Sequence, residues 1–403
     1  MADFKHLDAL LKEFAANGLP GCGCAVAKDG KVLYEGYHGM ADIEWQRPIA
    51  QDTVYRLYSM TKVVICTAAM MLYERGQYLL SDPIYEYIPE YRERSVVHHS
   101  PNGGVAIRDA KTPALIRHAF TMAVGLPYGF GDTPTTGAMR QINAELEAKH
   151  GKGMYSIVDE AKAIARVPAA FEAGEHFLYG YGHDIVAALI QVISGKSVWD
   201  FLREEIFGPL GMDSTGYRYF GDIRQRMATL YRRDASGGAA APGTAAASAP
   251  AAAVATADRR DHLHEANAKL ESGGAGLFST VGDYLKFTQM LANGGMHGGR
   301  QIIGRKTIDL MRQNHLSEQQ LKDFGGVYLA GYGYGLGVRT MMDLAAGGSN
   351  TSVGEFGWTG ALGTWASIDP SEGASVVYMH QTSPNMEEYY HLRTRAAAYG
   401  GLK

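Results

Sequence analysis

The chain has 403 residues, 46% of them hydrophobic, and a formal net charge of −4. A chain of this length and composition can bury a substantial core, which excludes disorder throughout. It has no block of lysine or arginine residues that would bind a polyanion, so we expect no nucleic-acid partner.

Two further classes are disfavoured by the sequence pattern. The longest strongly apolar run, residues 63–73, is far shorter than the roughly 20 residues of a membrane-spanning helix, so we expect no membrane partner. Residues 1–6 lack the basic and apolar regions of a secretory signal, and the expected location is cytoplasmic. The three cysteines are expected to be buried free thiols, with Cys22 and Cys24 on opposite faces of one strand.

The chain is predicted to open with a helix followed by a hairpin. Hydrophobic residues recur at helical spacing over residues 4–14, and Gly18 marks the end of this helix. Residues 21–27 and 31–37 are rich in strand-forming residues and are joined by Asp29-Gly30, a strong hairpin signal.

The middle of the chain is predicted to be mostly helical. Residues 63–75 are apolar on nearly all sides, which is typical of a helix buried in a large protein. Helical patterns continue to about residue 230, including residues 184–193 and 198–206. Residues 234–258 are almost entirely Ala, Gly, Pro, Ser and Thr, which favours a flexible surface insertion. An Ala-rich helical segment from Ala245 onward is the alternative.

The last third is predicted to return to strands. A helix near residues 281–293 precedes strand-like segments at 331–337, 363–368 and 374–381, and a helix over residues 387–398 ends the chain.

Strands at both ends and helices between them predict an α/β (α+β) fold with a central antiparallel sheet and an inserted helical lobe. We expect residues 1–75 and 265–403 to form the α/β lobe. Residues 76–264 are expected to form the helical lobe, including the insertion 234–258.

Ser59-Met-Thr-Lys62 is the strongest candidate for catalysis. It lies at the entry to the apolar helix, where residues three apart share one face. A serine hydroxyl needs a base, and a lysine in apolar surroundings loses proton affinity and can accept a proton. The alternative is a helix-capping serine with a solvated lysine, but residues 63–71 offer no polar face for that lysine. The nucleophile-elbow pattern of α/β-hydrolases is absent from the sequence.

A resemblance to a known family extends over nearly the whole chain. Four further segments carry it, in the same order along the chain as in that family. The sequence resembles the family VIII carboxylesterases, which share the fold of class C β-lactamases and D-Ala-D-Ala peptidases. The segments that carry it, besides Ser59-Met-Thr-Lys62, are residues 173–184, 207–213, 273–280 and 356–360.

The resemblance implies a role for Tyr179. Tyr179 would help Lys62 to deprotonate Ser59 and later to activate water, which requires a neighbouring ammonium to stabilise its phenolate. Tyr181 stands where the lactamases have an asparagine, so recognition of a substrate amide is weakened and Tyr181 becomes a substrate-binding candidate. His183 is a further pocket candidate, although a structural role is the simpler interpretation.

The resemblance also assigns Trp358-Thr359-Gly360 to substrate binding. The lactamases carry a cation here that attracts a substrate carboxylate, whereas Trp358 offers an apolar face and one N–H donor, which favours an uncharged substrate. Gly360 would allow close approach of the scissile carbonyl, and the backbone N–H groups of Ser59 and Ala361 would form the oxyanion hole. The alternative is a buried tryptophan beside a bulge glycine.

No cofactor or metal is expected, because no zinc-binding or nucleotide-binding pattern occurs. His262-Leu-His264 is interpreted as a solvated pair at the edge of the insertion, and His98-His99 as part of a loop.

These observations predict a serine carboxylesterase that acts on small or medium uncharged esters through a Ser59 acyl-enzyme. A small-molecule ester is the expected partner, and no feature indicates an oligomeric state. Three alternatives stay open: β-lactam or D-amino-acid peptide hydrolysis, acyl transfer, and a sensor that is acylated without turnover. Either Lys62 or Tyr179 is the general base.

Overall fold

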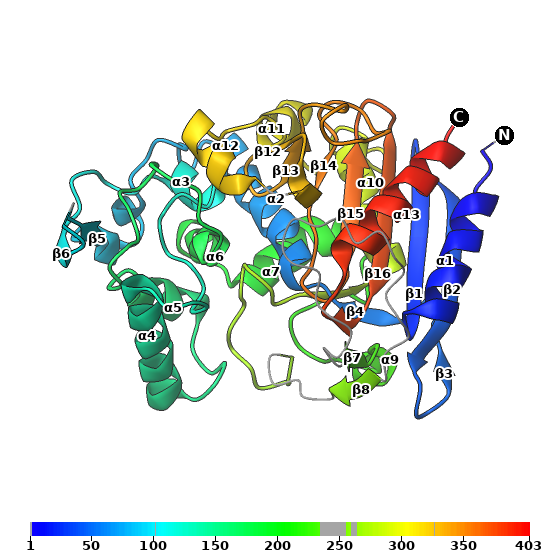
Figure 1. Ribbon diagram of the computed structural model, residues 1–403, viewed down its shortest axis with the longest axis horizontal. Coiled ribbons are helices and arrows are strands. Elements are labelled where there is room, and N and C mark those ends of the chain that lie inside the picture. The colour runs from blue at the N-terminus through cyan, green and yellow to red at the C-terminus, as the bar shows by residue number, and fades with distance from the viewer. Residues whose placement is uncertain (1, 101, 234–254, 259–263, 326) are drawn as a thin grey trace.

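The computed structural model describes residues 1–403 except 1, 101, 234–254, 259–263 and 326 (Figure 1). The first and last helices, α1 (Lys5–Asn17) and α13 (Glu387–Gly401), lie side by side near both termini. The hairpin of β5 and β6 and the helices α4 and α5 lie at the opposite end (Figure 1).

One eight-stranded antiparallel sheet combines strands from both ends of the chain, in the order β12-β13-β14-β15-β16-β1-β2-β3. Ala25 in the middle of β1 pairs with Glu35 on one side and Val377 on the other. The predicted sheet is therefore confirmed. Its strands are β1 (Gly21–Lys28), β2 (Lys31–Asp42), β3 (Arg47–Pro48), β12 (Tyr332–Tyr334), β13 (Arg339–Met341), β14 (Phe356–Gly357), β15 (Trp365–Asp369) and β16 (Ala374–His380).

Helices cover both faces of this sheet. Cys22, Cys24 and Val26 pack into one cluster with residues of α1 and α13, whereas Ala25 and Ala27 belong to the main core on the other face. β1 is therefore buried and apolar from Gly21 to Ala27, as expected of a strand covered on both sides. The cysteines are buried free thiols, as predicted. Their predicted placement on opposite faces is wrong, because residues two apart in a strand share a face.

The buried helix predicted after Ser59 is α2 (Thr61–Glu74), which packs against α6 (Gly182–Ser194). Every residue from Thr61 to Leu72 is buried, which explains the absence of a polar face. The strand β4 (Val54–Arg56), paired with β9 (Phe278–Thr280), leads the chain into this helix. The catalytic candidates at the start of α2 are thus anchored in the core.

The middle of the chain is mostly helical, but it also contains strands. β5 (Ser95–His99) and β6 (Val105–Asp109) form a hairpin, so the interpretation of His98-His99 as loop is wrong. The remaining helices are α3 (Ile116–Phe120), α4 (Pro134–His150), α5 (Ile157–Ile164), α7 (Val198–Leu202), α8 (Gly208–Leu210), α9 (Ile223–Arg226), α10 (Val281–Ala292), α11 (Arg305–Met311) and α12 (Glu318–Phe324).

Most of the predicted insertion 234–258 lies outside the described residues. Its end forms β8 (Ala255–Asp258), which pairs with β7 (Leu230–Arg233); β7 in turn pairs with β17 (Thr382–Ser383). This end is a strand, not a flexible segment. His264 is buried and bonds through its ring to the Tyr217 carbonyl, so its interpretation as solvated is also wrong. A short hairpin of β10 (Met296–His297) and β11 (Arg300–Gln301) completes the strands.

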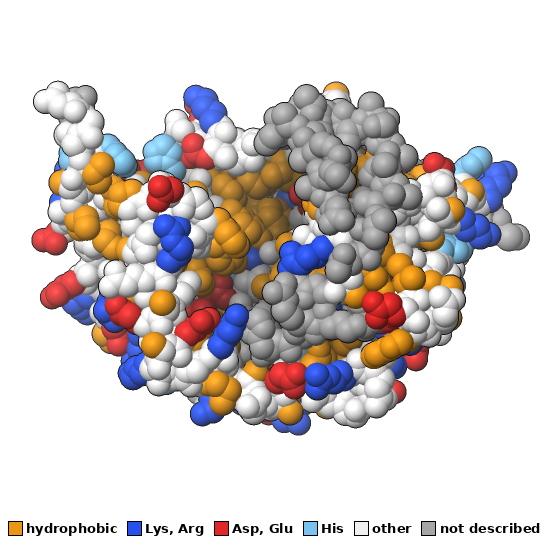
Figure 2. Space-filling model, turned by 60° about the horizontal axis from the view of Figure 1, so that its bottom comes forward, with side chains coloured by type: hydrophobic (Ala, Val, Ile, Leu, Met, Phe, Trp, Pro, Cys, Tyr) orange, Lys and Arg blue, Asp and Glu red, His pale blue; other side chains and the backbone are white. Residues whose placement is uncertain are grey.

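The surface shown in Figure 2 mixes acidic and basic side chains, and hydrophobic side chains gather in a hollow near its centre. Among the described helices, no single one has the length and apolar run of a membrane span. Gly182–Ser194 and Val198–Leu210 pass that test only as a pair, which is bent by 80° at its break.

Candidate active site

Ser59 lies on a sharp bend between β4 and α2. It belongs to a single 3-10 turn, Tyr58–Met60, and its side chain is half-buried. Tyr58 has a φ of +46°, a left-handed conformation that is uncommon for a residue with a Cβ. Such strained backbone is concentrated at functional sites, where the surrounding structure holds it in place.

The side chain of Lys62 is fully buried, and its Nζ donates three hydrogen bonds. The acceptors are Ser59 Oγ at 3.0 Å, Tyr128 Oη at 3.0 Å and the Gly274 carbonyl at 2.5 Å. All three acceptors are uncharged, and in the described part of the chain no carboxylate forms an ion pair with Lys62. Ser59 and Lys62 therefore lie together on one face, in the arrangement that proton transfer from the hydroxyl requires.

Tyr179 touches Lys62 through its ring. The Lys62 Nζ lies 4.8 Å from the ring centroid, while the Tyr179 hydroxyl accepts a hydrogen bond of 3.1 Å from Trp358 Nε1. The Tyr179 and Trp358 rings are stacked, with centroids 5.7 Å apart. Tyr179 is thus held between Lys62 and Trp358, with its hydroxyl on the Trp358 donor. The residues implied by the resemblance thus meet, although no hydrogen bond joins Tyr179 to Lys62 among the described residues.

Tyr128 is a site residue that no motif in the sequence indicated. Its hydroxyl accepts from Lys62, and burial, reinforced by the negative charge of Asp184, raises its pKa well above the usual value. Tyr128 is therefore a protonated phenol at neutral pH. It is one of 24 tyrosines, and only the fold brings it to Lys62.

Asp184 orients the carbonyl that holds Lys62. Its Oδ1 accepts from Ser272 Oγ at 2.6 Å and from the Gly274 N–H at 2.9 Å, while the Gly274 carbonyl accepts from Lys62. A Cβ at Gly274 would lie 2.6 Å from the Tyr128 hydroxyl and 2.7 Å from Asp184 Oδ2, so only glycine fits. Burial raises the pKa of the Asp184 carboxyl.

The segment after Trp358 packs against the backbone that precedes Ser59. The Gly360 N–H donates to the Thr364 carbonyl at 2.7 Å, and Thr364 Oγ1 donates to the Leu57 carbonyl at 2.9 Å. Ala361, the next residue, is exposed. Within the described ranges, the N–H groups of Ser59 and Ala361 donate to no protein acceptor, which leaves both free for an oxyanion.

The profile of a protein family described as Beta-lactamase matches residues 7–400. The chain belongs to the beta-lactamase family. The resemblance inferred from the Ser59 segment and its four companions is confirmed, and so is the fold class.

Relatives of this beta-lactamase family member include an esterase. Esterase EstB of Burkholderia gladioli is 26% identical over 394 residues, which cover 94% of this chain and 90% of EstB. Solved structures that share the fold include the following two. EstCE1, "a hydrolase with promiscuous acyltransferase activity", is 23% identical with a TM-score of 0.78, covering 98% of both chains. Simvastatin synthase (LovD) of Aspergillus terreus is 21% identical with a TM-score of 0.81, covering 99% of both chains.

The segment Trp358-Thr359-Gly360 has acidic and neutral side chains as hydrogen-bond partners. Thr359 Oγ1 donates to Glu387 Oε2 at 3.0 Å, and Asn385 Nδ2 donates to the Gly360 carbonyl at 3.4 Å. In the described part of the chain, no lysine or arginine hydrogen-bonds to Trp358, Thr359 or Gly360.

Tyr181 is half-buried, whereas His183 is fully buried. Tyr181 packs its ring on Tyr128, with centroids 4.9 Å apart, and its hydroxyl accepts from Asn143 Nδ2 at 2.9 Å. His183 is fully buried with its Nε2 2.9 Å from the Phe120 carbonyl, which fits a structural role.

Proposed function

We propose that this protein is a serine carboxylesterase that hydrolyses small or medium uncharged esters through a Ser59 acyl-enzyme. The observation that carries this proposal is the 3.0 Å hydrogen bond between Ser59 Oγ and the buried Lys62 Nζ. The esterase relatives support ester bonds as the substrate class.

The proposed reaction has two steps. A neutral Lys62 amine or the Tyr179 phenolate takes the Ser59 proton, and Oγ attacks the ester carbonyl carbon. The negative charge on the carbonyl oxygen is stabilised by the N–H groups of Ser59 and Ala361, the alcohol leaves with a proton, and the acyl group stays on Oγ. Water then attacks the acyl-enzyme, the same base takes its proton, and the carboxylic acid is released.

The preference for uncharged esters rests on the surroundings of Trp358. A substrate carboxylate would meet the apolar ring of Trp358 and the nearby Glu387 carboxyl, and its desolvation would be costly there. The Trp358 N–H is bonded to Tyr179, on which its ring also stacks, so Trp358 offers a substrate no charge and no unused donor. Trp358, Thr359, Gly360 and Tyr181 are therefore proposed as substrate-binding residues for a neutral group.

The first test is hydrolysis of p-nitrophenyl butyrate by the wild type and by Ser59→Ala. We expect kcat to fall on the order of 10⁴-fold or more in Ser59→Ala, as in other nucleophile deletions. Ser371→Ala, at an exposed turn, is the matched control and should retain full activity. A folded Ser59→Ala protein with wild-type activity would exclude this mechanism.

Acyl transfer to an alcohol is the second candidate, favoured by the acyltransferase activity named for EstCE1. Product analysis with p-nitrophenyl butyrate and added butan-1-ol separates the two reactions. Butyric acid as the main product supports hydrolysis, and butyl butyrate supports transfer. Faster turnover of nitrocefin than of the ester would favour β-lactam hydrolysis instead. A stoichiometric acyl-enzyme that never clears would favour the sensor.

A further inference from the structure

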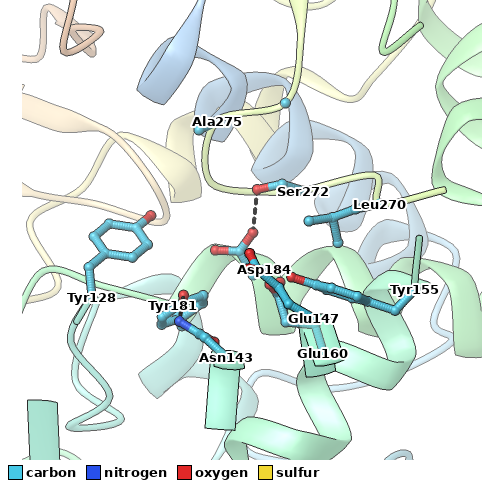
Figure 3. Close-up of a pocket in the computed structure, with 11 residues that line it drawn as sticks. Tyr128, Asn143, Glu147, Tyr155, Glu160, Tyr181, Asp184, Leu270, Ser272 and Ala275 are labelled. Carbon is cyan, nitrogen blue, oxygen red and sulfur yellow. Dashed lines mark hydrogen bonds between the residues drawn. The ribbon is translucent and has the colours of Figure 1, made fainter. Parts of the chain in front are cut away.

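A cavity of about 240 Å³ lies beside Tyr128 (Figure 3). It is formed by α4, α5, the start of α6 and the segment 270–276. Tyr128 lines this cavity and also hydrogen-bonds to Lys62, so the cavity and the Ser59 centre share a wall. The mechanism described above does not use it.

Two buried carboxyl groups line the cavity. Glu160 is only 4% exposed and Asp184 only 2%. Asp184 is engaged by Ser272 and Gly274, but Oε2 of Glu160 has no hydrogen-bond partner in the described part of the chain. Burial and the neighbouring Asp184 charge raise the pKa of Glu160 well above its usual value. Oε2 of Glu160 is thus a buried carboxyl oxygen without a donor among the described residues.

Aromatic rings complete the lining. Tyr128, Tyr155 and Tyr181 face this space together with Glu147, whose side chain is exposed (Figure 3). No lysine, arginine or histidine is among the described residues that line it. Tyrosine faces attract organic cations, and nearby carboxylates add a charge partner. A bare metal ion is a poorer match, because no three His, Cys, Asp or Glu side chains in the described residues are placed to hold one.

We propose that this cavity binds a small organic ammonium ligand that is separate from the ester substrate of Ser59. This cation binding does not depend on the proposed esterase function. A bound ammonium group favours the charged form of the neighbouring Glu160 carboxyl. Tyr155 and Tyr181 supply aromatic faces beside it.

The test uses two probes of the same shape. Choline carries a quaternary ammonium where 3,3-dimethylbutan-1-ol carries a neutral carbon, so the pair isolates the charge. Isothermal titration calorimetry is made on the wild type, Glu160→Gln and the control Glu145→Gln, which changes a solvent-exposed carboxylate on α4. We expect the wild type and Glu145→Gln to bind choline at least about tenfold more tightly than the alcohol, and Glu160→Gln to lose about tenfold in choline affinity only.

Equal affinities of the two probes in the wild type would overturn the proposal, and this comparison does not depend on a variant that folds. Unchanged choline affinity in Glu160→Gln would overturn it as well. Hydrolysis of p-nitrophenyl butyrate by the same protein tests the esterase proposal separately. Ester hydrolysis without a preference for choline over the neutral alcohol would reject the cation site and leave the esterase. Choline binding without hydrolysis of any ester would reject the esterase and leave the cation site.

Discussion

Two tyrosines contact Lys62, and their surroundings suit them to different tasks. Tyr128 accepts a hydrogen bond from Lys62 but lies near Asp184, and its raised pKa keeps it protonated. The Tyr179 hydroxyl accepts from the Trp358 N–H, and its ring lies over the Lys62 Nζ. Because Tyr128 stays a protonated phenol that accepts from Lys62, it suits a positioning role. Tyr179, which the resemblance assigns to the deprotonation of Ser59, is the remaining candidate for proton transfer.

This assignment predicts unequal effects of removing the two hydroxyl groups. Tyr179→Phe should lower kcat by about 10²- to 10⁴-fold, the usual contribution of a general base. Tyr128→Phe should cost about 10- to 100-fold, because it removes one hydrogen bond to a charged group. The measurement is kcat for p-nitrophenyl butyrate across pH, with folding checked by circular dichroism. A larger loss in Tyr128→Phe than in Tyr179→Phe would reverse the two roles.

Among the residues of the candidate active site, the sequence predicted those that lie within a motif. Ser59 and Lys62 are three residues apart, and a helix alone brings them together. Tyr128 and Gly274 reach Lys62 from 66 and 212 residues away. Their neighbourhood follows from helix packing and loop geometry, which leave no periodic signal in the local sequence.

At the scale of elements, the turn after Trp358 is fixed to the bend that carries Ser59. Thr364 Oγ1 hydrogen-bonds to the Leu57 carbonyl, and Gly360 lies directly against the same carbonyl. This contact sets the spacing between the two proposed oxyanion donors. A Cβ at Gly360 would collide with Leu57 O and Thr364 Oγ1, and a backbone carbonyl cannot move aside as a flexible side chain does.

Gly360→Ala should therefore separate the turn from Ser59. We expect kcat to fall on the order of 10²-fold, the cost of losing one oxyanion donor. Gly282→Ala in α10 is the matched control, because a Cβ there meets nothing within 4 Å. That change should leave activity intact and stabilise the helix by about 0.5–1 kcal/mol. Equal activity of both variants in the p-nitrophenyl butyrate assay would show that the contact does not set the donor geometry.

Element predictions succeeded where a strong local signal and burial agreed. The Asp29-Gly30 turn joins β1 and β2, and the apolar pattern after Ser59 is α2. The hairpin of β5 and β6 was missed because its strands have no clean inside–outside alternation, and Val105 and Ile107 are both exposed. Backbone pairing holds this hairpin together, and side-chain patterns do not report such pairing.

At the scale of the whole molecule, buried titratable groups give opposing dependences on pH. Burial lowers the pKa of His118 to about 4 and that of His183 to about 3. Burial raises the pKa of Asp184 and of Glu387. The histidines destabilise the fold as pH falls, whereas the carboxyl groups destabilise it as pH rises. The contribution of one group to the pH dependence of stability is measured by comparing the wild type with a variant that lacks that group.

His183→Gln isolates the contribution of His183. Its pKa is about 3 in the folded protein and about 6.5 in the unfolded chain, so between these values the unfolded chain binds more protons. Acid therefore favours unfolding of the wild type, and this contribution vanishes above about pH 7. From pH 7.5 to pH 5 the wild type should lose about 2 kcal/mol of unfolding free energy relative to His183→Gln. Urea unfolding of both proteins at the two pH values measures this difference; parallel profiles would mean that His183 takes up its proton within the fold.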